Sequence, residues 1–351
     1  MNKTSLQLSL FDMFGIDADI QKAEPVFQAE EFNLEPKFKV FRMDGNGESR
    51  FYFTLNDKGE PTYYISVTSL ISATMPTPYA LIKWRVDLGW EASVAYTAER
   101  AQYGTWLHIL CDKILIDKSL DLTGNTFLRE HLSNYLRTQD QDLSKPSWFT
   151  DIKNDLFAFH QFIRDHNVEP LVIEQALAHP DGYAGALDLL CYMDFDVKGF
   201  HGEVYKAGKR KGEKKETTET ERDISIVDYK SGRKGFHEQH EIQLKAYKNL
   251  VEFNYPSVKV RKMFNWSPKD WRSTPTYNLK DQTDSEPAKQ FPYLLQIARQ
   301  RKELLRPPAF RKLSGILDIN KSLDGLYAEV NPDDVARAMR GYVEDEPERK
   351  E

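Results

Sequence analysis

The sequence predicts an α/β protein in which a mixed central β-sheet is flanked by helices and accompanied by an N-terminal helical region. Three observations lead to this fold class. Apolar and polar residues alternate through much of 38–66, which is typical of strands. Apolar residues recur at helical spacing through much of 66–166. Residues 171–266 then combine apolar strand-like runs with one helical segment, which is the order expected of a mixed sheet covered by helices.

Several helix boundaries can be placed in the helical region. Ser66 or Thr68 can cap a first helix, and Pro78 is well placed to start a second helix over 79–88. A further helix carries an amphipathic apolar stripe, and two more helices are expected at 126–138 and 151–166. The stripe consists of Trp106, Leu107, Leu110, Ile114 and Leu115.

The second half of the chain is richer in strands. We expect strands at 171–178, 183–195, 224–229 and 258–266, and helices at 238–252 and 285–306. Residues from 341 onward are expected to be disordered. The chain then divides into a flexible tail (1–35), a region of strands and helices (36–166), a core (167–310) and a C-terminal extension with an acidic tail (311–351).

Composition limits the class of protein. The chain has 351 residues and no apolar run of about 18, so we expect no transmembrane helix, and its N-terminus does not read as a secretory signal. Cys111 and Cys191 have apolar flanks, which favours buried free thiols in a reducing compartment and hence a cytoplasmic location. Two cysteines are too few for a four-cysteine iron–sulfur cluster or zinc site, so neither is expected.

The most informative motif is Asp228-Tyr229-Lys230, which follows the apolar run 224–227. Because successive side chains of a strand point to opposite faces, Asp228 and Lys230 share one face. A carboxylate can hold a divalent cation, and a lysine beside it can position water and stabilise developing negative charge. The motif therefore indicates metal-assisted hydrolysis.

Three further motifs surround this one in the sequence. They are Gly104-Thr105-Trp106-Leu107-His108 on a helix, Glu174 followed by Gly185-Ala186-Leu187-Asp188 on strands, and Gln243-x-x-x-Tyr247 on a helix. Each has a plain alternative reading. His108 can be a core histidine, Glu174 a sheet-edge charge, and Gln243 and Tyr247 can simply pack at i,i+4 spacing. Asp188 is harder to explain in this way, because an unpaired carboxylate on a buried strand is costly.

Together these motifs resemble the PD-(D/E)XK nuclease superfamily, and in particular its RecB-like branch. Residues 67–85 are also similar to mitochondrial genome-maintenance exonucleases and to RecB-like exonucleases of phages and bacteria. The resemblance covers roughly 65–266 and implies a nuclease core, a mixed sheet flanked by helices, within 167–310. One departure is the separation of Asp188 and Asp228 by 228 − 188 = 40 positions, where the family usually has a short hairpin.

The resemblance implies roles for individual residues. His108, Asp188, Asp228 and the backbone carbonyl of Tyr229 would bind Mg²⁺ or Mn²⁺. Glu174 would bind a second metal or hold a water, and Lys230 would orient or activate the attacking water. Gln243 and Tyr247 would support Lys230 and contact the DNA backbone.

A basic insertion at 198–222 separates the two acids and accounts for their spacing. It is rich in Lys, Glu, Gly and Thr, and the bland interpretation is a solvated hairpin tip or a disordered loop. The sharper interpretation is an arm that contacts DNA phosphates despite the net charge of −6. Candidate DNA contacts in the arm and after the site are Lys209, Arg210, Lys211 and Arg233.

A second motif lies in the N-terminal tail. Gln7-Leu8-Ser9-Leu10-Phe11 matches the pentapeptide by which many bacterial replication and repair proteins bind the sliding clamp. Leu10 and Phe11 would fill an apolar pocket, and Gln7 would make polar contacts. The alternative is that Leu8 and its apolar neighbours dock on the chain's own core.

The expected function is that of a metal-dependent DNA nuclease, with an exonuclease acting on single strands or DNA ends favoured. Its setting would be replication, recombination or repair in a bacterium or its phage. The alternatives are a structure-specific endonuclease and a nuclease-fold protein that binds DNA as an accessory without cleaving it. Aromatic side chains of the helical region could stack on bases, although core packing is the commoner role. The candidates are Tyr79, Trp84, Tyr103 and Trp106.

Overall fold

The protein is described here by a computed structural model. The structure describes residues 34–44, 50–56, 61–139, 141–204, 206, 211, 214–233, 235–301, 311–313 and 327–329. The predicted clamp motif at 7–11, Lys209, Arg210 and the acidic tail from 341 onward lie outside the described residues.

The centre of the fold is an eight-stranded mixed sheet, which confirms the predicted mixed sheet flanked by helices. Strands β3 and β5 pair in parallel, as do β6 and β7, and the other neighbours are antiparallel. The order is β1-β2-β3-β5-β6-β7-β8, with β4 paired to β5. The strands are β1 (Phe41–Asp44), β2 (Arg50–Leu55), β3 (Pro61–Ser66), β4 (Glu169–His179), β5 (Tyr183–Val204), β6 (Lys214–Tyr229), β7 (Lys262–Pro268) and β8 (Tyr277–Asp281).

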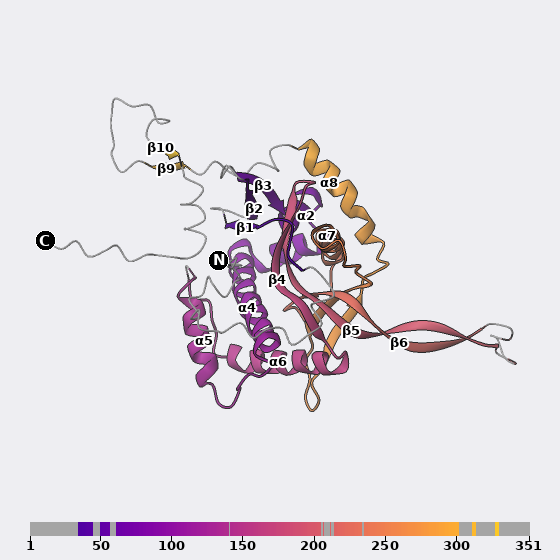
Figure 1. Cartoon of the computed structure of the whole chain (residues 1–351). Helices are drawn as coiled ribbons and strands as arrows, with labels where there is room; N and C mark the ends of the chain where they lie inside the picture. Colours follow the sequence, from indigo (N-terminus) through magenta and orange to yellow (C-terminus); the bar gives the residue numbers. More distant parts are fainter. Residues whose placement is uncertain are drawn as a thin grey trace, which may run out of the picture.

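Helices lie on both sides of the sheet (Figure 1), and the two larger apolar cores lie between these helices and the sheet. One core joins α2, α7 and α8 to the sheet, and the other joins α4, α5 and α6 to it. A short pair of strands, β9 (Arg311–Leu313) and β10 (Tyr327–Glu329), forms a separate sheet. The helices are α2 (Val67–Thr74), α3 (Tyr79–Leu88), α4 (Trp90–Asp117), α5 (Thr126–Leu136), α6 (Trp148–Asp165), α7 (Glu238–Asn254), η2 (Pro287–Gln290) and α8 (Phe291–Gln300).

The two cores explain the alternation along β6. Ile224 and Ile226 pack in the core that contains α7, whereas Val227 and Tyr229 pack in the core that contains α4 and α6. Asp228 has the same parity as Ile226, so the period-2 alternation of a strand turns it toward the α7 side of the sheet. This places the predicted acid near the carboxyl end of the buried part of β6.

Several sequence predictions are confirmed, including the first helix at Ser66, whose side chain accepts a hydrogen bond from the Ser69 N–H at 3.0 Å. Cys111 and Cys191 are buried free thiols, as predicted. Tyr103 and Trp106 are fully buried core residues and do not stack on bases, whereas Tyr79 is 79% exposed. None of the described helices combines the length and apolar character needed to cross a bilayer.

Of the two plain interpretations of 198–222, the disordered loop is wrong for most of its length, whereas the hairpin agrees with the pairing of β5 and β6. Strands β5 and β6 continue past the body as an antiparallel ribbon, pairing Asp196 with Thr220 and Lys198 with Thr218 (Figure 1). The threonines are β-branched and favour extended backbone. The two strands hydrogen-bond to each other, so the ribbon does not need a second layer of structure to pair its backbone groups. The predicted strand at 258–266 begins later, at Lys262, and β8 was not predicted.

Gly185, which opens the Gly185-Ala186-Leu187-Asp188 motif, is required by close packing between β5 and α7. A Cβ at this position would lie 2.7 Å from Cε1 of Tyr247 and 3.4 Å from Cγ2 of Val67. A separation of 2.7 Å is well inside van der Waals contact, and both neighbours belong to the core. The glycine therefore lets the Tyr247 ring lie against the β5 backbone.

We predict that Gly185→Ala lowers the free energy of unfolding by about 1–3 kcal/mol, because the added methyl group overpacks this contact. Gly232→Ala is a matched control, since a Cβ there meets nothing within 4 Å. Denaturant unfolding of both variants measures the difference. Equal stability of the two variants would contradict the packing argument.

Candidate active site

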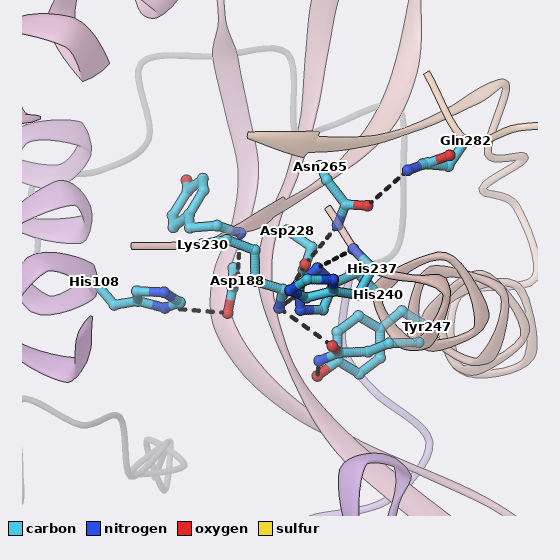
Figure 2. A network of polar contacts seen from close by, with 11 residues as sticks. His108, Asp188, Asp228, Lys230, His237, His240, Tyr247, Asn265 and Gln282 are labelled. Atoms are coloured by element: carbon cyan, nitrogen blue, oxygen red, sulfur yellow. Dashed lines mark hydrogen bonds and ion pairs between the residues drawn. The ribbon is translucent and has the colours of Figure 1, made fainter. Parts of the chain in front are cut away.

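The centre of the site is a buried ion pair at the end of β6. Nζ of Lys230 lies 2.8 Å from Oδ1 and 2.7 Å from Oδ2 of Asp228, which is 1% exposed (Figure 2). Burial raises the pKa of Asp228 to about 6, although the Lys230 charge works against this rise. The sequence prediction that Asp228 and Lys230 act as a unit thus matches their geometry.

Asp188 lies beside this pair on the neighbouring strand β5. The backbone N–H of Tyr229 donates a hydrogen bond of 2.7 Å to Oδ2 of Asp188, which joins the two predicted motifs directly. On the other side, Nδ1 of His108 lies 3.6 Å from Oδ1 of Asp188. Burial opposes ionisation of Asp188, but His108, Lys230 and the Tyr229 N–H together hold its pKa below the usual value.

His108 lies on α4 and approaches the acids from the side opposite α7 (Figure 2). Burial opposes its protonation, but the Asp188 carboxylate outweighs burial and raises the pKa of His108. The protonated imidazole pairs with Asp188, and the neutral imidazole offers a nitrogen ligand. His108 is therefore in the position that the Gly-x-x-x-His motif predicts.

Glu174 faces Asp188 across the β4–β5 pair. The β4–β5 register is unchanged before and after Glu174, since Ile173 lies opposite Leu189 and Gln175 lies opposite Leu187. Its φ is 44°, a left-handed conformation that costs about 1–3 kcal/mol for a residue with a Cβ and is concentrated at functional sites. Burial and the Asp188 charge raise the pKa of Glu174 to about 7.

Gln243 and Tyr247 hold the lysine from α7. Oε1 of Gln243 accepts a hydrogen bond from Nζ of Lys230 at 3.2 Å, and its Nε2 donates to the Tyr247 hydroxyl at 2.6 Å. His240, in the first turn of α7, also lies beside the lysine (Figure 2). Burial and the Lys230 charge lower the pKa of His240 to about 3, so its imidazole is neutral. The predicted support of Lys230 by the Gln-x-x-x-Tyr helix is thus seen directly.

The side-chain amides of Asn265 and Gln282 also help to hold the Asp228 carboxylate in place, and the sequence analysis did not predict either of them. Nδ2 of Asn265 donates a 2.7 Å hydrogen bond to Oδ2 of Asp228, and Nε2 of Gln282 donates to Oδ1 of Asn265 at 3.2 Å (Figure 2). Both amide side chains are buried. A polar Asn between the apolar Phe264 and Trp266 was the available signal, because a buried amide needs a polar partner.

A third missed residue is Asp112, which lies one helical turn after His108 on α4. It is 1% exposed, and neither carboxylate oxygen has a hydrogen-bond partner. Burial, followed by the charges of Glu174 and Asp188, raises its pKa well above the usual value. The i,i+4 spacing of His108 and Asp112 was visible in the sequence and places both on one helix face.

The site has more acidic than basic groups. The Asp188 charge acts on Glu174, Asp228 and Asp112, and the Glu174 charge also acts on Asp112, while Lys230 and His108 are the basic side chains paired with Asp228 and Asp188. Oxygen ligands of this kind suit Mg²⁺ or Mn²⁺, so the donor set fits a hard divalent cation. Within the described part of the chain, no three His, Cys, Asp or Glu side chains are already gathered closely enough to hold an ion.

The remaining predicted residues lie away from this cluster. Arg233 forms ion pairs with Asp155 and with Asp270, and the Arg233 Nε lies 3.3 Å from Oδ1 of Asp270. The second carboxylate oxygen of Asp155 accepts a hydrogen bond of 2.7 Å from the Tyr103 hydroxyl. These contacts tie the segment after Lys230 to α6. Lys211 is exposed at a turn near the end of the β5–β6 ribbon. A role for Arg233 and Lys211 in DNA binding stays a prediction.

Comparison with models of protein families and with curated protein sequences finds no match.

The raised pKa of Glu174 predicts a pH-dependent stability. Between its usual value of 4.5 and about 7 the unfolded chain releases a proton that the native protein retains. The native state then binds more protons, so this contribution is complete below pH 4.5 and is lost as pH rises through 7. In metal-free protein, Glu174→Gln should gain stability relative to wild type over that interval, on the order of 1–3 kcal/mol.

Denaturant unfolding at several pH values in the presence of a chelator measures this gain. Glu219→Gln, which changes an exposed glutamate on the β5–β6 ribbon, is the matched control and should follow the wild-type curve. Parallel curves for Glu174→Gln and wild type would show that the Glu174 carboxyl titrates normally.

Proposed function

We propose that this protein is a Mg²⁺- or Mn²⁺-dependent DNA nuclease with a RecB-like PD-(D/E)XK core, acting as an exonuclease on single strands or DNA ends. The observation that carries the proposal is the buried Asp228–Lys230 pair set against an excess of carboxylates. If the ion pair had only a structural role, the additional carboxylates of Asp188 and Glu174 beside it would be unfavourable, because like charges destabilise a buried cluster. A hydrolytic site that binds a cation does need them.

Each residue of the site would have its own role in phosphodiester hydrolysis. Asp188 and Asp228, with a nitrogen of His108, would hold the cation, which supplies Lewis acidity and lowers the pKa of a bound water. Lys230 is kept in place by Asp228 and Gln243, so its ammonium can orient the attacking water and stabilise charge on the phosphate oxygens. Asn265 helps to fix the orientation of the Asp228 carboxylate, because its Nδ2 donates a hydrogen bond to Oδ2.

Exposed aromatic side chains on α3 and the start of α4 support a single-stranded substrate. Tyr79, Trp90 and Tyr96 are each more than half exposed, and the Arg85 guanidinium lies 5.5 Å from the Trp90 ring centroid. Stacking on aromatic rings, aided by arginine, is how proteins bind single strands without sequence preference. Helix α4 runs on from these residues to His108, so a strand stacked there would lead along the helix to the site.

The enzyme proposal predicts metal-dependent cleavage by the purified chain. Asp228→Asn and Lys230→Met should each lower the rate by on the order of 10²–10⁴, because each removes a group that acts in the transition state. Lys289→Met, at an exposed lysine on η2, is the control and should keep wild-type activity. Single-strand, duplex and circular DNA, labelled at the 3′ or 5′ end, form the substrate panel.

Outcomes of the same panel separate the rival functions. Cleavage of circular DNA would favour a structure-specific endonuclease, and stepwise release from one labelled end favours the exonuclease. DNA binding with no cleavage under Mg²⁺ or Mn²⁺ would favour a non-cleaving accessory protein and contradict the proposal. Unchanged rates in both site variants would refute the site assignment.

We also propose the bacterial sliding clamp as a partner through residues 7–11. Leu10→Ala together with Phe11→Ala should abolish clamp binding, because these two side chains would fill the apolar pocket. Ser9→Ala is the matched control within the motif. Calorimetric titration of each variant with the clamp measures binding, and nuclease activity should be unchanged. Equal binding by the double variant, or its failure to fold, would instead support docking of the segment on the chain's own core.

A further inference from the structure

His240 has no role in the hydrolytic scheme above, yet it lies on the face of α7 that holds Lys230. Residues 240, 243 and 247 follow the i, i+3, i+7 spacing that places side chains on one face of a helix. Gln243 accepts a hydrogen bond from Lys230, and Tyr247 is bonded to Gln243. His240 therefore lies one turn before Gln243 on the same face, beside the lysine (Figure 2).

His240 is the most exposed of these three side chains. Gln243 and Tyr247 are 8% and 5% exposed, whereas His240 is only partly buried. Within the described part of the chain, Nε2 of His240 has no hydrogen-bond partner, and it is not among the fully buried polar atoms that lack one. This nitrogen is therefore the part of the α7 face that a ligand bound at Lys230 can contact.

The start of α7 sets the tautomer of His240. The backbone N–H of His237 donates a hydrogen bond of 3.2 Å to Nδ1 of His240, so Nδ1 carries no proton. The neutral imidazole then has its proton on Nε2, which makes Nε2–H a hydrogen-bond donor. Burial and the charges of Lys230 and His237 lower the pKa of His240 to about 3, which keeps the imidazole neutral at ordinary pH.

Capping of α7 alone does not account for a histidine at this position. A glutamate at the third position of a helix makes the same contact with the backbone N–H of the cap residue. A glutamate here would add a carboxylate beside Lys230, where it would compete with Asp228 for the ammonium. The imidazole instead caps the helix without a charge and adds a donor beside the ammonium. Two neighbouring donors suit a phosphodiester, because its anionic oxygens only accept hydrogen bonds.

We propose that His240 is a further catalytic residue, whose Nε2–H donates a hydrogen bond to a non-bridging oxygen of the phosphodiester that Lys230 engages. This inference rests on the proposed nuclease function, and none of the motifs that carry the family resemblance includes residue 240. A neutral donor stabilises the charge that develops on the phosphate oxygens and needs no proton transfer. Because the His237 N–H holds the ring, the donor is oriented before the substrate binds.

Two amide substitutions separate the donor from the helix cap. In His240→Asn, Oδ1 takes the place of Nδ1 and keeps the cap, but no atom replaces Nε2. In His240→Gln, an amide N–H takes the place of Nε2–H. We expect His240→Asn to lower kcat for single-strand cleavage by about 10–100-fold at an unchanged melting temperature, and His240→Gln to stay within about threefold of wild type. His160→Asn, the same change at an exposed histidine on α6, is the control and should keep the wild-type rate.

A second measurement uses the wild-type chain and does not depend on cleavage. Long-range proton–nitrogen correlation NMR of the histidine rings gives the tautomer of His240 in the presence of a chelator. A single-stranded thymidine oligonucleotide, added at a concentration that saturates binding, then probes the contact. We expect the Nε2–H tautomer in the free protein and a shift of the Nε2 resonance in the complex.

The outcomes separate this inference from the proposed function. If wild type cleaves DNA and His240→Asn is equally active, the inference is wrong and the nuclease function stands. Equal losses in both amide variants, a proton on Nδ1, or an unshifted Nε2 resonance would also overturn it. Should His240→Asn fail to fold, the wild-type resonance decides. No cleavage by wild type under Mg²⁺ or Mn²⁺ would overturn the nuclease function, and with it the catalytic role of His240.

Discussion

The burial of several carboxylates at the carboxyl end of β6 is the constraint on which the site depends. Asp228 is tolerated there because Lys230 and Asn265 bind it, and Asp188 because the Tyr229 N–H and His108 do. The fold brings these partners together from the end of β6, from β7 and from α4. Glu174 and Asp112 add further negative charge at the cluster, and a divalent cation would offset it.

The scaffold around this cluster is built to hold it from both sides. Helix α4 supplies His108 from one core, and α7 supplies Gln243 from the other, so the acids lie where the two helical layers meet the sheet (Figure 2). Gly185 allows α7 to approach β5 closely, which positions Tyr247 and through it Gln243. Precision at the site thus follows from packing of buried elements and not from the flexible ends of side chains.

Local patterns made part of this site predictable. The period of a strand places Asp228 and Lys230 on one face, and the i,i+4 spacing of a helix joins Gln243 to Tyr247. The polar Asn265 between two apolar residues was visible in the sequence, but its partner Asp228 was not predictable, because their contact depends on the parallel β6–β7 register, which no local pattern encodes. The β5–β6 ribbon was missed because its strands pair with each other beyond the body, so no buried face imposes an apolar period on them.

The central claim, that the carboxylate cluster binds a divalent cation, is tested most directly by thermal unfolding across a Mn²⁺ titration. Ligand binding to the native state stabilises it by RT ln(1 + [L]/Kd), about 2.7 kcal/mol at a hundred times Kd. If the cluster binds Mn²⁺, the melting temperature rises with Mn²⁺ in wild type and stays constant in the Asp188→Asn/Asp228→Asn double variant. A melting temperature that is independent of Mn²⁺ in wild type would contradict this claim.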